Sequence, residues 1–111
     1  MSVLAIDAGT TGVTALVVDE TGAVVARGYE EFPQHFPQPG WVEHEPEQIW
    51  QATLSACRQA MRSDHGRSVT AVGLTNQRET AVLWDRSSLA APRRAMVWQD
   101  EQVSDVSLSA V

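Results

Sequence analysis

The sequence predicts a mixed α/β fold, in which a three-stranded antiparallel meander is followed by a helix and further strands. Short runs rich in β-branched residues fill the first third of the chain and are separated by turns that contain glycine. Over Gln48–Arg62, apolar residues recur every three or four positions, which is the spacing of an amphipathic helix. A strand-like apolar run, Val69–Leu74, comes next. The length of 111 residues fits one domain with a modest core.

Three strands are expected before the helix, at Met1–Asp7, Val13–Asp19 and Ala23–Phe32. A tight turn over residues 8–12 connects the first to the second. The second connection, residues 20–22, ends in a glycine, which readily adopts the positive φ of a hairpin turn. Residues 33–40 contain three prolines and a glycine, so they are expected to form a loop.

The helix is expected to begin at Pro46, because proline suits the first helical position and acidic residues surround it. A stripe is predicted from apolar residues at offsets of four, three and four, namely Trp50, Leu54, Cys57 and Met61. Ile49, Thr53, Ala56 and Ala60 lie just beside that stripe, so one broad face is expected to be buried. Cys57, the single cysteine, is therefore expected to be a small buried residue. A connection and three strands are expected to follow, at Asp64–Ser68, Val69–Leu74, Thr80–Asp85 and Ala95–Trp98.

Composition argues against several classes of function. The formal net charge of −6 disfavours a nucleic-acid partner, because no basic stripe is present to neutralise phosphates. All eight basic residues are arginine, whereas a Walker-type phosphate loop needs a lysine. The three histidines lack the spacing of a structural zinc site. Neither a signal peptide nor a membrane-spanning apolar run is evident, so we expect a cytoplasmic protein without membrane insertion.

The first candidate motif is "IDAGTTG", residues 6–12. Asp7 follows a predicted buried strand, where a carboxylate can hold Mg²⁺ directly or through water. Gly9 lets the backbone approach a ligand closely, and Thr10 and Thr11 add hydroxyl groups that can face a phosphate. The alternative is a hairpin turn in which the aspartate accepts local hydrogen bonds.

The second candidate motif is "TNQRE", residues 75–79, which lies between two apolar runs. Arg78 and Glu79 offer fixed donors and fixed acceptors with nearly cancelling charge. Such a pair suits a neutral ligand with several hydroxyl groups, since each hydroxyl both donates and accepts. The alternative is a solvent-exposed turn pair that contributes little energy. Trp98, which comes after a short predicted strand, is a candidate to line the same ligand site.

Four stretches together resemble the N-terminal part of the FGGY family of carbohydrate kinases: "IDAGTTG", "PQPGWVEHEPEQIW", "GLTNQRETAVLWD" and "AMVWQD". They stand in the family's order and spacing, from about Val3 to Asp100. The "NQRET" segment resembles the branch that phosphorylates glycerol, because the xylulokinase branch typically carries a different segment there. The resemblance implies an RNase-H-like domain of the actin, hexokinase and Hsp70 ATPase type. This chain would be the first half of the first such domain.

The resemblance also implies a role for each candidate residue. ATP and Mg²⁺ would be the cofactors, and the γ-phosphoryl group would pass to a terminal hydroxyl of glycerol, giving glycerol 3-phosphate. Full-length relatives often form dimers or tetramers. The implied contacts are Asp7 with Mg²⁺, Gly9, Thr10 and Thr11 with the nucleotide phosphates, Arg78 and Glu79 with the glycerol hydroxyls, and Trp98 with the glycerol carbons.

The chain departs from the family pattern at three places. Ala8 stands where members often have glutamine, and Thr14 stands near a position that is often basic. After Asp100 the chain continues with Glu101 and Gln102, where members usually have two arginines. We therefore expect residues 1–100 to be the N-terminal portion of the first kinase domain and residues 101–111 to be a divergent tail, produced by truncation or a frameshift.

The same resemblance predicts that the 111 residues alone are inactive. The aspartate that acts as general base in the family, and the second domain, lie beyond the end of this chain. A polyol hydroxyl is a poor nucleophile without a base to accept its proton. Two alternatives stay open: a fragment of another FGGY polyol or sugar kinase, or a non-catalytic remnant that serves as a binding module.

Overall fold

We analysed a computed structural model, which describes residues 1–77 and 80–97. The chain divides into two compact units. The first comprises residues 1–32 and 49–76, and the second comprises residues 33–48 and the described residues from 77 onward. In the part of the chain that the structure describes, no helix is long and apolar enough to cross a membrane.

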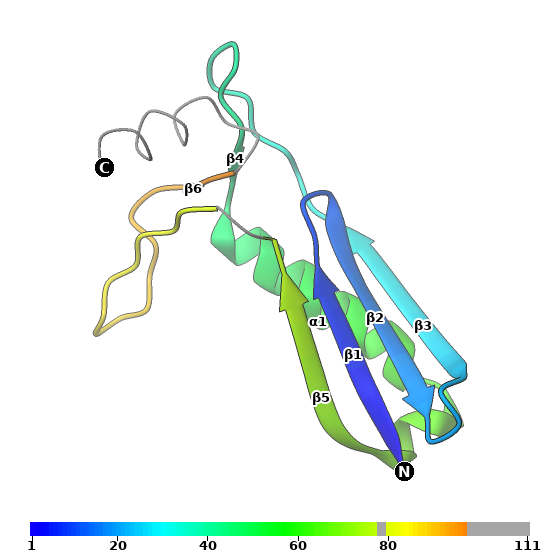
Figure 1. Cartoon of the computed structure of the whole chain (residues 1–111). Coiled ribbons are helices and arrows are strands. Elements are labelled where there is room, and N and C mark those ends of the chain that lie inside the picture. The colour runs from blue at the N-terminus through cyan, green and yellow to red at the C-terminus, as the bar shows by residue number, and fades with distance from the viewer. Residues whose placement is uncertain (78–79, 98–111) are drawn as a thin grey trace, which may run out of the picture. The chain divides into compact units, whose positions relative to one another are not determined.

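The first unit contains a four-stranded sheet with the strand order β3-β2-β1-β5 (Figure 1). The predicted meander is confirmed, because β1 pairs antiparallel with β2 and β2 pairs antiparallel with β3. The fourth strand joins the other edge of β1 in parallel. Gly22, with φ of 87°, closes the predicted hairpin turn between β2 and β3. The bounds are β1 Ser2–Ala8, β2 Gly12–Asp19, β3 Val24–Glu31 and β5 Val69–Asn76.

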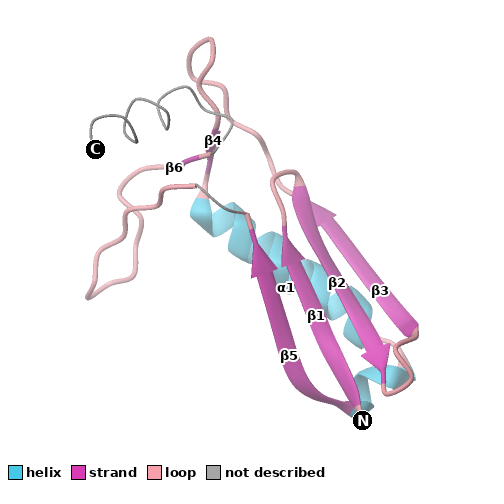
Figure 2. Ribbon diagram, in the orientation of Figure 1, coloured by secondary structure: helices cyan, strands magenta, loops and turns pink. Residues whose placement is uncertain are grey.

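Helix α1, Pro46–Met61, covers one face of this sheet (Figure 2). It begins at the predicted residue, and Ala56 and Ala60 of the predicted broad face are buried, but the prediction was wrong at Trp50 and Met61. Trp50 is 53% exposed and Met61 is 38% exposed, whereas Cys57 is only partly buried. The helix residues that the sheet buries are three alanines at intervals of four, Ala52, Ala56 and Ala60.

Close approach between helix and sheet explains why alanine occupies this contact. A Cβ atom on Gly28, in β3, would overlap the backbone carbonyl oxygen of Ala56 and would lie 2.8 Å from the Cβ atom of Gln59. Two backbones this close leave no room between them for tryptophan or methionine. The core of the unit therefore combines small helix residues with residues in and directly after the strands: Leu4, Val13, Ala15, Val17, Phe32, Ala52, Ala56 and Ala60.

The second unit contains two short strands, β4 Glu43–His44 and β6 Ala95–Met96, which pair antiparallel. Strand β4 was not predicted, because two polar residues carry no strand pattern. The strand expected at residues 80–85 was wrong: Ala81 forms an isolated bridge to Met96, and residues 82–85 form no strand. Strand β6 begins at the predicted Ala95. The expected connection, η1 Asp64–Ser68 in the first unit, is a short 3₁₀ helix.

Gly28→Ala is expected to destabilise the chain by about 1–3 kcal/mol, because the added methyl group overlaps the α1 backbone. Gly73→Ala, on exposed β5, is the matched control, since nothing lies within 4 Å of its Cβ position. We expect the control to change stability by no more than about 1 kcal/mol. Urea unfolding followed by circular dichroism measures both, and equal stabilities for the two variants would contradict the close-packing explanation.

Candidate functional site

The parallel pairing of β1 with β5 brings the two candidate motifs to the same edge of the sheet. In this register Asp7 lies beside Thr75, and Ala8 lies beside Asn76. Both strands run in the same direction, so the first motif and the start of the second leave the sheet together (Figure 1). Ligands of open α/β sheets commonly bind at the carboxyl ends of parallel strands.

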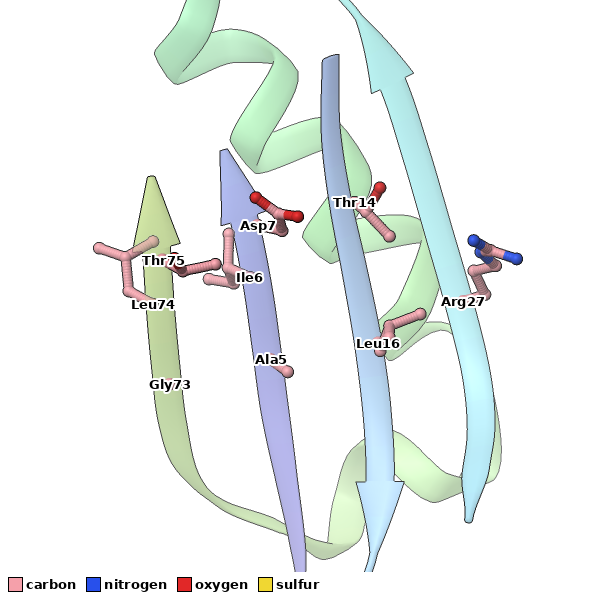
Figure 3. Close-up of a pocket in the computed structure, with 9 residues that line it drawn as sticks. All are labelled: Ala5, Ile6, Asp7, Thr14, Leu16, Arg27, Gly73, Leu74 and Thr75. Atoms are coloured by element: carbon pink, nitrogen blue, oxygen red, sulfur yellow. The ribbon is translucent and has the colours of Figure 1, made fainter. Parts of the chain in front are cut away.

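A hollow lies on the sheet below this edge, and Asp7 is its carboxylate (Figure 3). Thr14 of β2 is the antiparallel partner of Asp7, and Thr75 of β5 is its parallel partner. Arg27, on β3, supplies the positive charge in the same hollow. A carboxylate, a guanidinium and hydroxyl groups can together receive a ligand that carries both a cation and anionic oxygens. The full lining is Ala5, Ile6, Asp7, Thr14, Leu16, Arg27, Gly73, Leu74 and Thr75.

The turn between β1 and β2 holds the predicted phosphate-binding residues Gly9, Thr10 and Thr11. The backbone N–H of Gly9 donates to the carbonyl of Gly12 at 3.0 Å, which closes the turn. The steric need for glycine falls on Gly12, because a Cβ atom there would lie 2.7 Å from the hydroxyl of Tyr29. At Gly9 the closest such contact is an ordinary 3.4 Å. Sequence reasoning missed this constraint at Gly12, and the close approach of a ligand at Gly9 stays a prediction.

The residues present fit a magnesium ion that arrives with a nucleotide. Within residues 1–77 and 80–97, no group of three or more histidine, cysteine, aspartate or glutamate side chains could hold a metal. Mg²⁺ is usually held by one or two carboxylates, with phosphate oxygens and water completing its shell. Asp7, exposed at the edge of the hollow, is sufficient for that arrangement but not for a resident metal cage.

The three predicted substrate contacts, Arg78, Glu79 and Trp98, lie outside the described residues. The residues on either side of the first two are described and belong to a hydrogen-bonded group. Gln77 Nε2 lies 3.3 Å from His44 Nδ1, and Thr80 Oγ1 donates to Gln77 Oε1 at 2.8 Å. His44 Nε2 lies 2.6 Å from the Oε1 atom of Gln34. We call Gln34, His44, Gln77 and Thr80 the His44 cluster.

Sequence reasoning missed the His44 cluster. His44 is fully buried, and burial lowers its pKa, with the nearby charge of His35 adding a smaller effect in the same direction. Its neighbour Glu43 is also buried and pairs with Arg93 at 3.2 Å. The available signal was "GWVEHEP", which places polar residues directly before the helix but does not show that they are buried.

Comparisons with known proteins agree on one family. The model of the N-terminal domain of the FGGY family of carbohydrate kinases matches residues 2–108. A glycerol kinase of Bradyrhizobium diazoefficiens is 50% identical over 94% of this chain and 21% of its own length. A glycerol kinase of Nitrobacter hamburgensis is 49% identical, again over 94% of this chain and 21% of its own length. The chain therefore spans about a fifth of the length of the curated relatives it matches.

Solved structures show the same fold. A glycerol kinase of Plasmodium falciparum, solved with ADP, superposes with a TM-score of 0.79 at 27% identity, covering 98% of this chain and 22% of that one. A xyloylose kinase from Brucella ovis gives a TM-score of 0.82 at 30% identity, covering 100% of this chain and 25% of that one. These values confirm the predicted RNase-H-like fold class.

The buried imidazole predicts how stability depends on pH. Because the pKa of His44 is lower in the folded chain than its ordinary value of 6.5, the unfolded chain binds more protons as pH falls below that value. The contribution of neutral His44 to the free energy of unfolding is therefore fully present above about pH 6.5. It is lost as pH falls below that value, by at most about 1.4 kcal/mol per pH unit. Urea unfolding between pH 5 and pH 8, compared with His44→Gln, isolates this contribution. If the free energy of unfolding fell equally steeply with pH in the wild type and in His44→Gln, this contribution of His44 would be contradicted.

Proposed function

The chain belongs to the FGGY family of carbohydrate kinases, and we propose from this premise that it is the N-terminal part of an ATP-dependent kinase that phosphorylates glycerol. The observation that carries the proposal is the identity of about 50% to proteins named glycerol kinase over 94% of the chain. Fold alone does not select a substrate, because kinases of xylulose and gluconate superpose equally well. The choice of glycerol rests on the sequence.

On the nucleotide side, we assign Asp7 to Mg²⁺ and the Gly9–Thr11 turn to the phosphates of ATP. Bound Mg²⁺ supplies positive charge that neutralises the phosphates. Support comes from the hollow at the sheet edge, where Asp7 stands between two threonines. Thr14 stands near a position where the family resemblance leads us to expect a basic residue. Arg27 lines the same hollow and offers a cation on the neighbouring strand.

On the substrate side, we assign Arg78 and Glu79 to the hydroxyls of glycerol and Trp98 to its carbon atoms. Support comes from the pairing of β1 with β5, because Asn76, two residues before Arg78 in the sequence, lies beside Ala8 and next to the partner of Asp7. A guanidinium and a carboxylate together match a neutral triol, which needs donors and acceptors but no net charge. Two alternative functions stay open. The first is another FGGY polyol or sugar kinase, and the second is a binding module without catalysis.

The reaction requires more protein than these 111 residues. A general base must accept the proton of the attacking hydroxyl, and the family's base lies in sequence that this chain does not contain. We therefore propose that residues 1–100 act as part of a larger cytoplasmic enzyme, with residues 101–111 a divergent tail. Dimers or tetramers, as in full-length relatives, are the expected assemblies.

Completion of the chain tests the proposed substrate. Residues 1–100 joined to the remaining sequence of the Bradyrhizobium relative are expected to phosphorylate glycerol with ATP in a coupled assay, whereas the 111-residue chain is expected to show no turnover. The comparison substrates are xylulose and erythritol. Faster turnover of either sugar or polyol than of glycerol would favour the alternative kinase, and robust turnover by the 111 residues would refute the need for more protein.

Asp7→Asn in the completed enzyme is expected to lower kcat by about 10²–10³-fold, the usual effect of removing one electrostatic contact in a transition state. The substitution keeps the size of the side chain and removes the charge that holds Mg²⁺. Asp19→Asn is the matched control, because Asp19 lies at the opposite end of the β1–β2 ladder from Asp7. A similar loss of kcat in both variants would show that the effect is structural.

A further inference from the structure

The sheet of the first unit has two outer strands, β3 and β5 (Figure 2). An outer strand presents unpaired backbone N–H and C=O groups along one edge, and another strand can pair with them. Proteins usually protect such an edge with charged side chains, with bulges or with a covering element. The two outer strands of this sheet differ in their protection, and the difference indicates which edge can receive a partner.

Strand β3 has a protected edge. Arg27, Glu30 and Glu31 place charges on it, and its ladder with β2 contains a register shift. Helix α1 adds cover through Gln59. The Gln59 Oε1 atom accepts the backbone N–H of Tyr29 at 3.1 Å, and Gln59 Nε2 donates to the Glu30 carboxylate at 3.1 Å. Backbone and side-chain groups of β3 are therefore already engaged within the unit.

Strand β5 lacks these protections over most of its length. Its sequence, VTAVGLTN, contains no charged residue and no proline, and residues 70–76 are all exposed. Its register with β1 is regular from Ala71 to Asn76. Among the described residues, no side chain forms a hydrogen bond with residues 70–76. An uncharged, regular and exposed outer strand is the kind that pairs with a further strand.

One face of β5 continues the apolar core of the unit. In the parallel ladder Val72 lies beside Leu4 and Leu74 lies beside Ile6, so the two residues of each pair share a face of the sheet. Leu4 and Ile6 belong to the core that α1 covers. Val72 and Leu74 extend this apolar stripe outward, but they are 63% and 71% exposed. A partner at this edge would remove their apolar surface from water, which favours association.

We infer that the 111-residue chain forms a twofold dimer, in which β5 of one copy pairs antiparallel with β5 of a second copy. The strand is complementary to itself when Gly73 lies on the twofold axis. In that register Val72 of each copy faces Leu74 of the other, and the four apolar side chains meet on one face. Moving the axis by one residue would place an apolar side chain opposite Thr70 or Asn76. The dimer does not rest on the proposed function, because it needs no ligand.

Charge explains both why the partner is a second copy at this strand and why association stops there. A chain with a formal net charge of −6 repels its own copies, so self-association needs an uncharged surface, and β5 is the uncharged outer strand. The pairing uses the free edge of β5 in both copies. It leaves β3 of each copy at the two ends of the joined sheet. Because β3 is protected, the assembly closes at two copies.

Sedimentation equilibrium and hydrogen exchange of the 111-residue chain test for the dimer. We expect a reversible equilibrium between monomer and dimer. The amides of residues 71–75 that point away from β1 should become more protected as the protein concentration rises. A chain that stays monomeric would overturn the inference, and protected amides in that monomer would show that another segment of the same chain covers the edge. Open-ended aggregates would also overturn it, since the proposed assembly closes at two copies.

A lysine on each outer strand distinguishes the β5 edge from the rest of the surface. Val72→Lys places a cation opposite Leu74 of the second copy and is expected to raise the dissociation constant of the dimer by at least about tenfold. Val24→Lys is the matched control, because Val24 lies on β3 and is 56% exposed. The control is expected to leave the dissociation constant unchanged, and circular dichroism checks that both variants fold. An equal effect of the two lysines would count against pairing through β5.

Disulfide crosslinking tests the register, in a Cys57→Ala background that removes the single cysteine. Residues directly opposite in an antiparallel pair have Cα atoms about 4.5–5.5 Å apart, a separation that a disulfide can bridge. Gly73→Cys is therefore expected to give a disulfide-linked dimer under mild oxidation. Ala71→Cys, on the same face of β5, is the matched control and should crosslink far less, because it faces Thr75 of the second copy. No crosslink from Gly73→Cys, or a stronger one from Ala71→Cys, would overturn the proposed pairing.

Discussion

The parallel ladder between β1 and β5 is the constraint on which the candidate site depends. Residues 7 and 75 are far apart in sequence, and this ladder makes them neighbours. Parallel strands cannot be joined by a tight turn, so the chain must leave the sheet and return to it. Here β2, β3, β4, α1 and η1 lie between β1 and β5 in the chain. The ladder thus makes neighbours of two motifs that this long connection separates in sequence.

The chain between β1 and β5 can return to the sheet because helix α1 packs very close to it. Gly28 and the alanines of α1 remove side-chain volume at the place where the two backbones meet, so α1 can lie on β3. Trp50 and Met61 of α1 are left exposed, away from this contact. On β5, Val72 and Leu74 are also more than half exposed. Relatives about five times longer supply additional chain, and surface of this kind is normally covered in a folded domain.

The sequence predicted the elements whose patterns are local. The meander could be predicted because β-branched runs and the hairpin at Gly22 are local signals, and the start of α1 could be predicted because proline at the first helical position is one too. The centre of the buried face of α1 could not, since hydrophobicity pointed to Trp50 whereas the contact with Gly28 selected alanine. Likewise Asp7 could be placed at the end of a strand, but its neighbour Thr75 depends on a pairing that no local pattern encodes.

The second unit shows why a buried polar residue can be more useful than an apolar one. Strands β4 and β6 are two residues long, so their ladder has few bonds to fix its register. A slip of one residue would exchange His44 with Glu43 and move every side chain to the opposite face. An apolar residue at position 44 would tolerate such a slip, because apolar contacts are not directional. The imidazole does not tolerate it, because its two nitrogens must meet one acceptor and one donor at the same time. His44 therefore selects a single register for β4, and that register determines where Gln77 and Thr80 are held.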